Sequence, residues 1–156
     1  EGLSPHVEID RVRLWISQIV AALDYLHDRD ILHRDIKSAN IFVSDSGDAR
    51  LGDLGSGKDV SHQFSGTASS RSFVGTPLFM APELFTDNNA NSRASDMWSL
   101  GVVLHHLLTL HLPFTGVTLF DLVESHREMS VCGIVAPEHA PPNLAAVLME
   151  LLNINP

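Results

Sequence analysis

The amino-acid sequence predicts a mainly helical domain with one small β-hairpin. Two stretches carry apolar residues at helical spacing: residues 8–27, where these residues recur every three or four positions, and residues 97–110, which are apolar at most positions. Between them, residues 41–43 and 49–52 flank the polar stretch 45–48, which is typical of two short paired strands. We therefore expect one helical core with a two-stranded sheet beside it.

Size and charge exclude several classes of protein. The chain has 156 residues, of which 44% are hydrophobic and 19% are charged, as in one globular domain. A net charge of -9 argues against a surface that binds nucleic acid or an anionic membrane. No apolar run reaches the roughly 18 residues of a membrane span. Because Cys132 is the single cysteine, no disulfide can form within the chain, and we expect an intracellular, cytoplasmic location.

The helices follow from the apolar pattern and from its breaks. In residues 8–27 an apolar stripe faces one side, whereas residues 97–110 are apolar on nearly every side, as in a central buried helix. Ser95 is the expected N-cap of that central helix. Two shorter helices are expected at residues 119–128 and 143–152. Residues 56–72 hold six serines and few apolar residues, so we expect a polar loop. The apolar stripe of the first helix consists of Val12, Ile16, Ile19, Leu23 and Leu26.

The hairpin brings oxygen ligands together in this prediction. If its turn is centred between Ser46 and Gly47, Asn40 and Asp53 lie opposite each other at the open end, with Asp35 close by on the preceding loop. An amide oxygen and a carboxylate are hard donors that suit Mg²⁺. Since Mg²⁺ is usually held by one or two carboxylates plus phosphate oxygens, the pair predicts a nucleotide that carries the metal.

The histidines at the end of the central helix are weaker candidates for a metal site than Asn40 and Asp53. His105 and His106 are adjacent, so on a helix their side chains point about 100° apart. No cysteine or carboxylate stands at zinc-like spacing near these two or near His111. We therefore expect ordinary buried or solvated histidines there.

Five short motifs occur in one order along the chain. The string H-R-D-I-K-S-A-N at residues 33–40 is followed by D-L-G at 53–55, G-T-P at 75–77, A-P-E at 81–83 and D-M-W-S-L-G at 96–101. Each is weak by itself, and His33-Arg34-Asp35 alone would be a solvated turn. Together and in this order they resemble the protein kinase family. The resemblance implies that residues 1–156 form the C-terminal, large lobe of a kinase domain, without the N-terminal lobe and the end of the domain.

The resemblance implies roles for the polar residues of these motifs. Asp35 would accept the proton of a substrate hydroxyl, Lys37 would offset charge on the transferred phosphoryl group, and Asn40 and Asp53 would hold the Mg²⁺ of ATP. In this family a Lys two positions after the catalytic Asp is usual in serine/threonine kinases. The implied activity is transfer of the γ-phosphoryl group of ATP to serine and threonine hydroxyls of protein substrates.

Other residues acquire structural or regulatory roles by the same resemblance. Residues 56–72 would be the activation loop, with Ser72 as its phosphorylation site, Thr67, Ser69 and Ser70 as competing sites, and Arg34 as the receiver of the phosphate. Thr76 would help to select serine or threonine substrates. His33 and Leu54 would pack in an internal column. Asp96, which could equally be a favourable acid in the first turn of a helix, would hydrogen-bond the catalytic-loop backbone. Glu83 would lack its usual arginine partner.

Departures from the family pattern leave alternatives open. Leu54 replaces the usual Phe, which together with the sequence around residues 72–84 is similar to NIMA-related kinases. Nothing before Asp35 offers a Gly-rich loop, a strand Lys or its helix Glu, so we expect the given chain to be inactive in isolation. A kinase-derived scaffold or binding module without catalysis is the alternative. A helical adaptor outside the family would require all five motifs to be coincidental.

Overall fold

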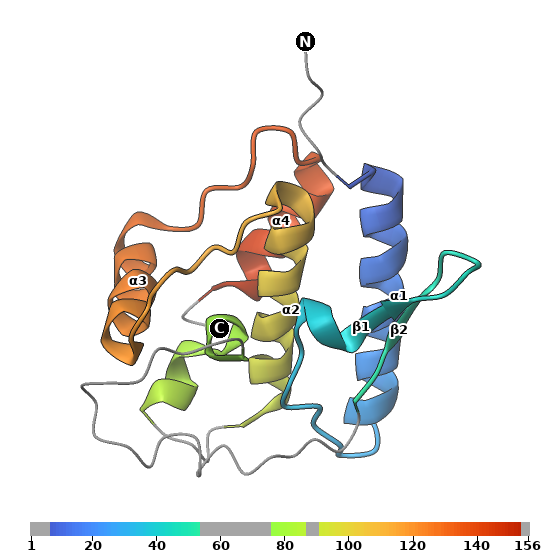
Figure 1. Ribbon diagram of the computed structural model, residues 1–156, viewed down its shortest axis with the longest axis horizontal. Helices are drawn as coiled ribbons and strands as arrows, with labels where there is room; N and C mark the ends of the chain where they lie inside the picture. Colours follow the sequence, from blue (N-terminus) through green and yellow to red (C-terminus); the bar gives the residue numbers. More distant parts are fainter. Residues whose placement is uncertain (1–6, 54–75, 87–90, 154–156) are drawn as a thin grey trace.

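The computed structural model describes residues 7–53, 76–86 and 91–153. Within these ranges the chain forms the helices α1, α2, α3 and α4 and one antiparallel hairpin of strands β1 and β2 (Figure 1). In the same ranges, three single turns of 3-10 helix, η1, η3 and η4, connect these elements. Their bounds are α1 Ile9–His27, η1 Ser38–Asn40, β1 Ile41–Val43, β2 Ala49–Leu51, η3 Thr76–Phe79, η4 Pro82–Phe85, α2 Arg93–Thr109, α3 Leu119–Cys132 and α4 Pro142–Leu151.

Helix α2 is the centre of the described structure. Helices α1 and α4 and the turn η3 all pack against α2 (Figure 1). The hairpin lies along α1, and α3 contacts η4. Leu100, Val102 and Leu104 are completely buried, because α2 has neighbours on nearly every side. This confirms the prediction of a central apolar helix. No helix in the described ranges is long and apolar enough to cross a membrane.

The first helix is also confirmed in its position and its buried face. The predicted stripe residues Val12, Ile16, Ile19, Leu23 and Leu26 are all buried in α1. Beside them Trp15 Nε1 donates to the backbone oxygen of Gly47, and Gln18 Nε2 donates to Asp48, so α1 also holds the turn of the hairpin.

The start of α2 corrects the sequence-based prediction. The N-cap is Ser92, whose side chain accepts from the backbone N–H of Ser95, and the helix begins at Arg93. The predicted cap, Ser95, instead stands at the third helical position, where its hydroxyl accepts from Ser92 N. The reciprocal pair satisfies two backbone donors at once, which favours the earlier start. Helix α3 similarly continues to Cys132, beyond its predicted end.

The register of the hairpin corrects a second prediction. Ile41 pairs with Leu51 and Val43 with Ala49, which centres the turn on Ser46. Asn40 therefore lies opposite Gly52, whose N–H donates to the backbone oxygen of Asn40 at 2.9 Å. Asp53 follows one residue later. The predicted symmetric pairing of Asn40 with Asp53 is wrong by one position, because Gly47 has a φ of 88° and the turn closes through a bond from its N–H to Ser44.

Candidate active site

Residues 33–37 form a loop between α1 and η1 that is attached to α2 by one carboxylate. Asp96 is 2% exposed, and it accepts hydrogen bonds from the backbone N–H groups of His33 and Arg34, both at 2.9 Å. Arg34 has a left-handed φ of 68°, which orients two successive N–H groups toward a single anion. The buried carboxylate thus stabilises a backbone conformation that an arginine rarely adopts.

A third donor to Asp96 was not anticipated from the sequence. His27, the last residue of α1, is buried, and its Nε2 lies 2.8 Å from Asp96 Oδ2. His27 follows Leu23 by four positions and so continues the apolar stripe of α1, which is the signal that could have identified it. Asp96 therefore joins the end of α1, the loop and α2 at one point.

The polar residues of the loop form a hydrogen-bonded group around Asp35. Lys37 Nζ donates to Asp35 Oδ2 at 2.7 Å. Asn40 Nδ2 donates both to the backbone oxygen of Asp35, at 2.8 Å, and to Asp35 Oδ2, at 3.0 Å. These contacts use one carboxylate oxygen only. Asp35 Oδ1 is buried and has no hydrogen-bond partner among the described residues.

Gly52 connects this group to the end of the hairpin. Its backbone oxygen lies 3.0 Å from His33 Nε2, while Asp35 N donates to His33 Nδ1 at 3.3 Å. The neutral imidazole with its proton on Nε2 satisfies both contacts. A Cβ at residue 52 would lie 2.6 Å from the ring of Phe42, so a larger residue here would require the Phe42 side chain to move. Asp53, which follows Gly52, is exposed and has a left-handed φ of 63°.

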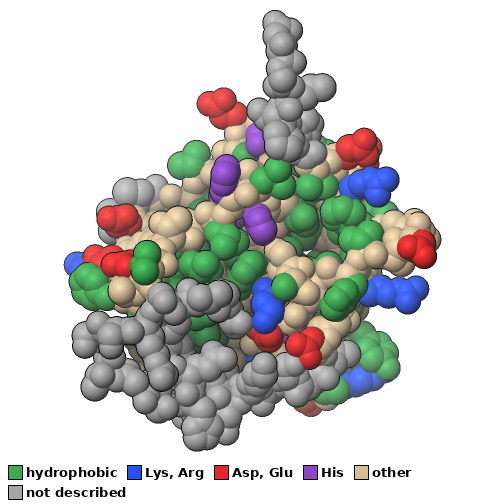
Figure 2. Space-filling view, viewed as in Figure 1, with side chains coloured by type: hydrophobic (Ala, Val, Ile, Leu, Met, Phe, Trp, Pro, Cys, Tyr) green, Lys and Arg blue, Asp and Glu red, His purple; other side chains and the backbone are tan. Residues whose placement is uncertain are grey.

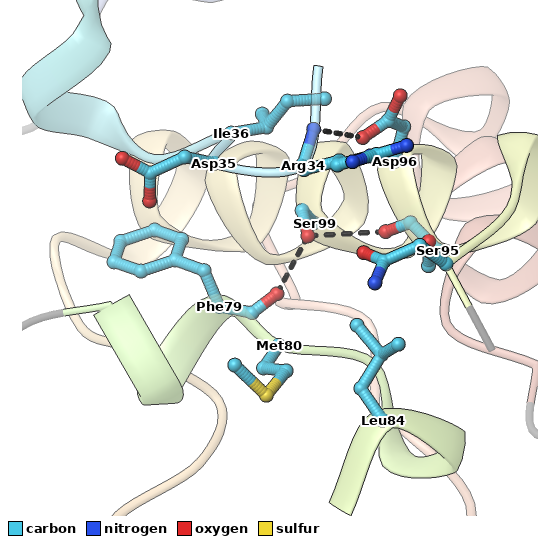
Figure 3. A pocket seen from close by; sticks show the side chains of 10 residues that line it. Arg34, Asp35, Ile36, Phe79, Met80, Leu84, Ser95, Asp96 and Ser99 are labelled. Atoms are coloured by element: carbon cyan, nitrogen blue, oxygen red, sulfur yellow. Dashed lines mark hydrogen bonds between the residues drawn. The ribbon is translucent and has the colours of Figure 1, made fainter. Parts of the chain in front are cut away.

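Figure 3 shows a pocket with Asp35 at one side, between the loop, the first half of α2 and the residues of η3 and η4. Phe79, the last residue of η3, and Met80, which follows it, line the pocket from one side, and Ser99 lines it from α2. Ser99 Oγ donates to the backbone oxygen of Phe79 at 2.8 Å, which fixes the end of η3 against α2. The pocket is therefore built by three parts of the chain that are distant in sequence.

The remaining residues singled out in the sequence have varied positions. Glu83 lies in η4, is half-buried and forms no ion pair with any residue in the described ranges. Thr76 is the first residue of η3, and its side chain lies outside the described part, as do Leu54, Ser72 and residues 56–72 as a whole. Arg34 is exposed and lines the pocket beside Asp35.

The chemistry available at this site is that of a proton acceptor beside a cation. Asp35 Oδ1 has no hydrogen-bond donor among the described residues, so this carboxylate oxygen can accept a proton or a hydrogen bond once a substrate group reaches it. The ammonium group of Lys37, 2.7 Å from Oδ2, adds positive charge for an anionic group. The Asn40 amide uses its Nδ2 toward Asp35, which leaves its oxygen for a hard cation together with the Asp53 carboxylate.

Comparisons with known proteins agree with the order of the motifs. The model of the family described as "Protein kinase domain" matches residues 4–156. A putative serine/threonine-protein kinase A of Trypanosoma brucei brucei is 42% identical over 109 residues, which cover 68% of this chain and 24% of that protein. Serine/threonine-protein kinase Nek5 of Mus musculus is 36% identical over 151 residues, covering 94% of this chain and 23% of that protein.

A plant relative is similar at the same level. CBL-interacting serine/threonine-protein kinase 20 of Arabidopsis thaliana is 34% identical over 145 residues, which cover 92% of this chain and 32% of that protein. The chain thus spans a quarter to a third of the length of these relatives. The similarity to serine/threonine kinases, with a Nek protein among them, confirms the resemblance inferred from the motifs.

Proposed function

The chain belongs to the protein kinase family, and we propose that it supplies the catalytic loop of a serine/threonine kinase that transfers the γ-phosphoryl group of ATP to protein hydroxyls. In this proposal Asp35 accepts or orients the proton of the substrate hydroxyl, and Lys37 offsets charge on the phosphoryl group. The observation that carries it is the buried Asp35 Oδ1, which has no partner among the described residues and belongs to a residue that lines the pocket.

The donor set fits the metal that such a reaction uses. Protein kinases generally use ATP with Mg²⁺, and Asn40 and Asp53 offer one amide oxygen and one carboxylate, which are the ligand types that Mg²⁺ prefers. The Asn40 side chain is oriented by its two bonds to Asp35. The metal would shield the phosphate charge, while Asn40 would link the metal ligands to the proton acceptor through a single side chain.

We further propose that the chain is the C-terminal lobe of its kinase domain and acts with a second lobe. The exposed apolar residues of β1 support this, because Phe42 is 57% exposed and Val43, on the opposite face of the strand, is 49% exposed. Exposed apolar groups next to the proposed metal ligands are what a second domain and a purine ring would cover. A kinase-derived scaffold without catalysis is the alternative, and it predicts protein binding without turnover.

Two substitutions in the full-length protein test the proposed chemistry. Asp35→Asn removes the proton acceptor, and we expect phosphoryl transfer to fall by about 10²–10⁴ while ATP affinity stays within about threefold. Asp53→Ala removes a metal ligand, so transfer and Mg²⁺-dependent ATP binding should both be lost. Asp10→Asn, on the exposed face of α1, is the control. Near-normal turnover of the Asp35→Asn protein would refute the assignment, and a wild-type protein without turnover would favour the scaffold.

Regulation by phosphorylation of Ser72 is a separate proposal. Arg34 is exposed, stands beside Asp35 and forms no ion pair in the described part of the chain, so its guanidinium is suited to bind a phosphate in a fork. Ser72→Ala and Arg34→Ala should then abolish the activation that follows phosphorylation of the full-length protein. Equal activation of both variants and wild type would exclude Ser72 as the switch.

A further inference from the structure

Helix α2 holds the loop of the candidate active site at two points. Near its first turn Asp96 binds the backbone of His33 and Arg34. Near its last turn His106 Nδ1 lies 2.9 Å from the hydroxyl oxygen of Ser38. Asp96 and His106 are ten positions apart, which corresponds to about 15 Å along a helix. The same rigid element therefore contacts both ends of residues 33–38.

Ser38 is the first residue of η1, the turn that ends at Asn40. The turn is closed by the backbone bond from Asn40 N to Lys37 O at 3.0 Å. Asn40 in turn bonds Asp35 twice through its side chain. Any displacement of Ser38 thus moves a short, closed turn whose last residue fixes the carboxylate.

Packing alone leaves room beside Ser38. An apolar pocket opens between α1, β1 and α2, and Ser38 is the polar residue at its lining together with Ile19, Ile41, Val103 and Leu107. Side chains that face a void lose the dispersion contacts that would otherwise hold them. The hydrogen bond to His106 is therefore a specific polar contact between this end of the loop and α2.

The surroundings of His106 favour a neutral imidazole. Partial burial and, to a smaller extent, the charge of neighbouring His111 lower the pKa of His106 below its ordinary value. The neutral ring can accept the Ser38 proton at Nδ1 or donate its own, so the bond forms in either tautomer. Figure 2 shows histidine side chains gathered on one face. Among the described residues, no group of three or more His, Cys, Asp or Glu side chains is arranged to hold a metal ion.

We propose that His106 is a positioning residue that orients Asn40 and Asp35 by holding Ser38 against α2. The inference rests on the proposed kinase function for its effect on turnover. Its structural part, the attachment of η1 to α2, can be measured without turnover.

The test uses four variants of the full-length protein: His106→Ala, Ser38→Ala, the double variant, and His106→Asn, whose amide can replace Nδ1. We expect kcat to fall about three- to tenfold in each single alanine variant, with KM for ATP within about twofold. The double variant should be no slower than the slower single variant, since both changes remove the same bond. His106→Asn should recover at least half of the lost kcat. His105→Ala, the neighbouring histidine that bonds His111 O, is the matched control.

Amide hydrogen exchange of residues 38–40 is measured on the same proteins. Exchange should be faster in His106→Ala and Ser38→Ala and unchanged in His105→Ala. Unchanged exchange in the first two, or losses in kcat that multiply in the double variant, would overturn the inference. If the wild-type protein transfers no phosphate, the proposed function fails, and the exchange rates alone decide whether His106 holds the turn.

Discussion

Two buried or half-buried carboxylates in the site have opposite environments. Both oxygens of Asp96 accept hydrogen bonds, from His33 N and His27 Nε2 on one and from Arg34 N on the other. Asp35 uses only Oδ2, and its Oδ1 is buried without a partner among the described residues. A fully satisfied carboxylate stabilises the fold, whereas an unsatisfied one is available to a ligand.

Replacing Asp96 should therefore lower the stability of the protein more than replacing Asp35. Asp96→Ala leaves two backbone N–H groups and a histidine without their acceptor in the interior, and we expect a loss of roughly 3 kcal/mol in the free energy of unfolding. Urea unfolding of the purified protein measures it. Asp10→Asn, which loses only an exposed pair with Arg13, should change the midpoint much less. Equal shifts in both variants would contradict the assigned role.

His126 is the residue whose protonation should matter most for stability. Its ring is 3% exposed and stacks on Phe114, with centroids 3.8 Å apart, and Nδ1 donates to Leu122 O at 2.8 Å. Burial lowers the pKa of His126 below its ordinary value, although the backbone oxygens of Leu122 and Met80 act in the other direction. The charged ring is thus disfavoured in the folded protein.

Acidification should consequently destabilise the protein through His126. The unfolded chain binds a proton near pH 6.5, and the folded chain does so only at lower pH. The stabilising contribution of neutral His126 is fully present above about pH 6.5. Below that pH the free energy of unfolding falls by at most about 1.4 kcal/mol per pH unit for one group. Urea unfolding between pH 7.5 and 5 should show a steeper decline for wild type than for His126→Phe. Phe85→Leu, in the same ring cluster, should lower the free energy of unfolding by the same amount at every pH. The same dependence of this free energy on pH in His126→Phe and in wild type would refute the role of His126.

At the scale of elements, α2 is the helix against which α1, α4 and η3 pack. It begins at the Ser92 cap and ends with Leu110 in a left-handed conformation. Along its length, α2 binds the loop 33–37 through Asp96, the end of η3 through Ser99, and η1 through His106. A helix that is buried on nearly every side can contact several segments, but it leaves little space for change.

Gly101 lies where α2 is in close contact with the end of α4. A Cβ at this position would lie 2.8–2.9 Å from side-chain atoms of Leu151 and Leu152. Gly101→Ala should therefore destabilise the protein by about 1–3 kcal/mol through overpacking, which exceeds the gain of up to about 1 kcal/mol in helix propensity. Thermal unfolding measures the change. Ser17→Ala on the exposed face of α1 lacks the clash and serves as control, and a stabilised Gly101→Ala protein would show that α4 can move away.

At the scale of the whole molecule, large apolar residues are exposed in several places, and four of them lie on β1 or near the end of α1. Phe42 and Val43 lie on β1, and Tyr25 and Ile31 lie at the end of α1 and just beyond it. Their exposed fractions are between 47% and 59%. The hairpin thus presents apolar side chains beside the proposed metal ligands Asn40 and Asp53.

Residues 1–156 alone should therefore bind a hydrophobic dye and bind ATP more weakly than the full-length protein. The physical reason is that the purine would meet only one apolar wall. Dye fluorescence and calorimetric titration with ATP and Mg²⁺ measure both effects, and Phe42→Ser should lower the dye signal. A monodisperse, dye-silent chain that binds ATP as tightly as the full-length protein would instead indicate a self-sufficient module.

The sequence by itself determined the features that depend on neighbours along the chain. The apolar spacing of α1, the apolar sides of α2 and the hairpin at residues 41–51 were predictable, because helical and strand periods are local properties. The order of five motifs was also sufficient for the family, as the match over residues 4–156 confirms. The start of α2 and the register of β1 with β2 were not, since reciprocal serine bonds and the turn geometry decided them.

Only the tertiary structure decided which polar groups meet. His27 and Asp96 are 69 positions apart, and Ser38 and His106 are 68 positions apart, so no local pattern relates them. Each pair depends on how α1 and the loop pack against α2, which sets side-chain distances to within a hydrogen bond. The unpartnered Oδ1 of Asp35 arises in the same way, because Lys37 and Asn40 bond only the other oxygen and Phe79 reaches the pocket from a distant turn.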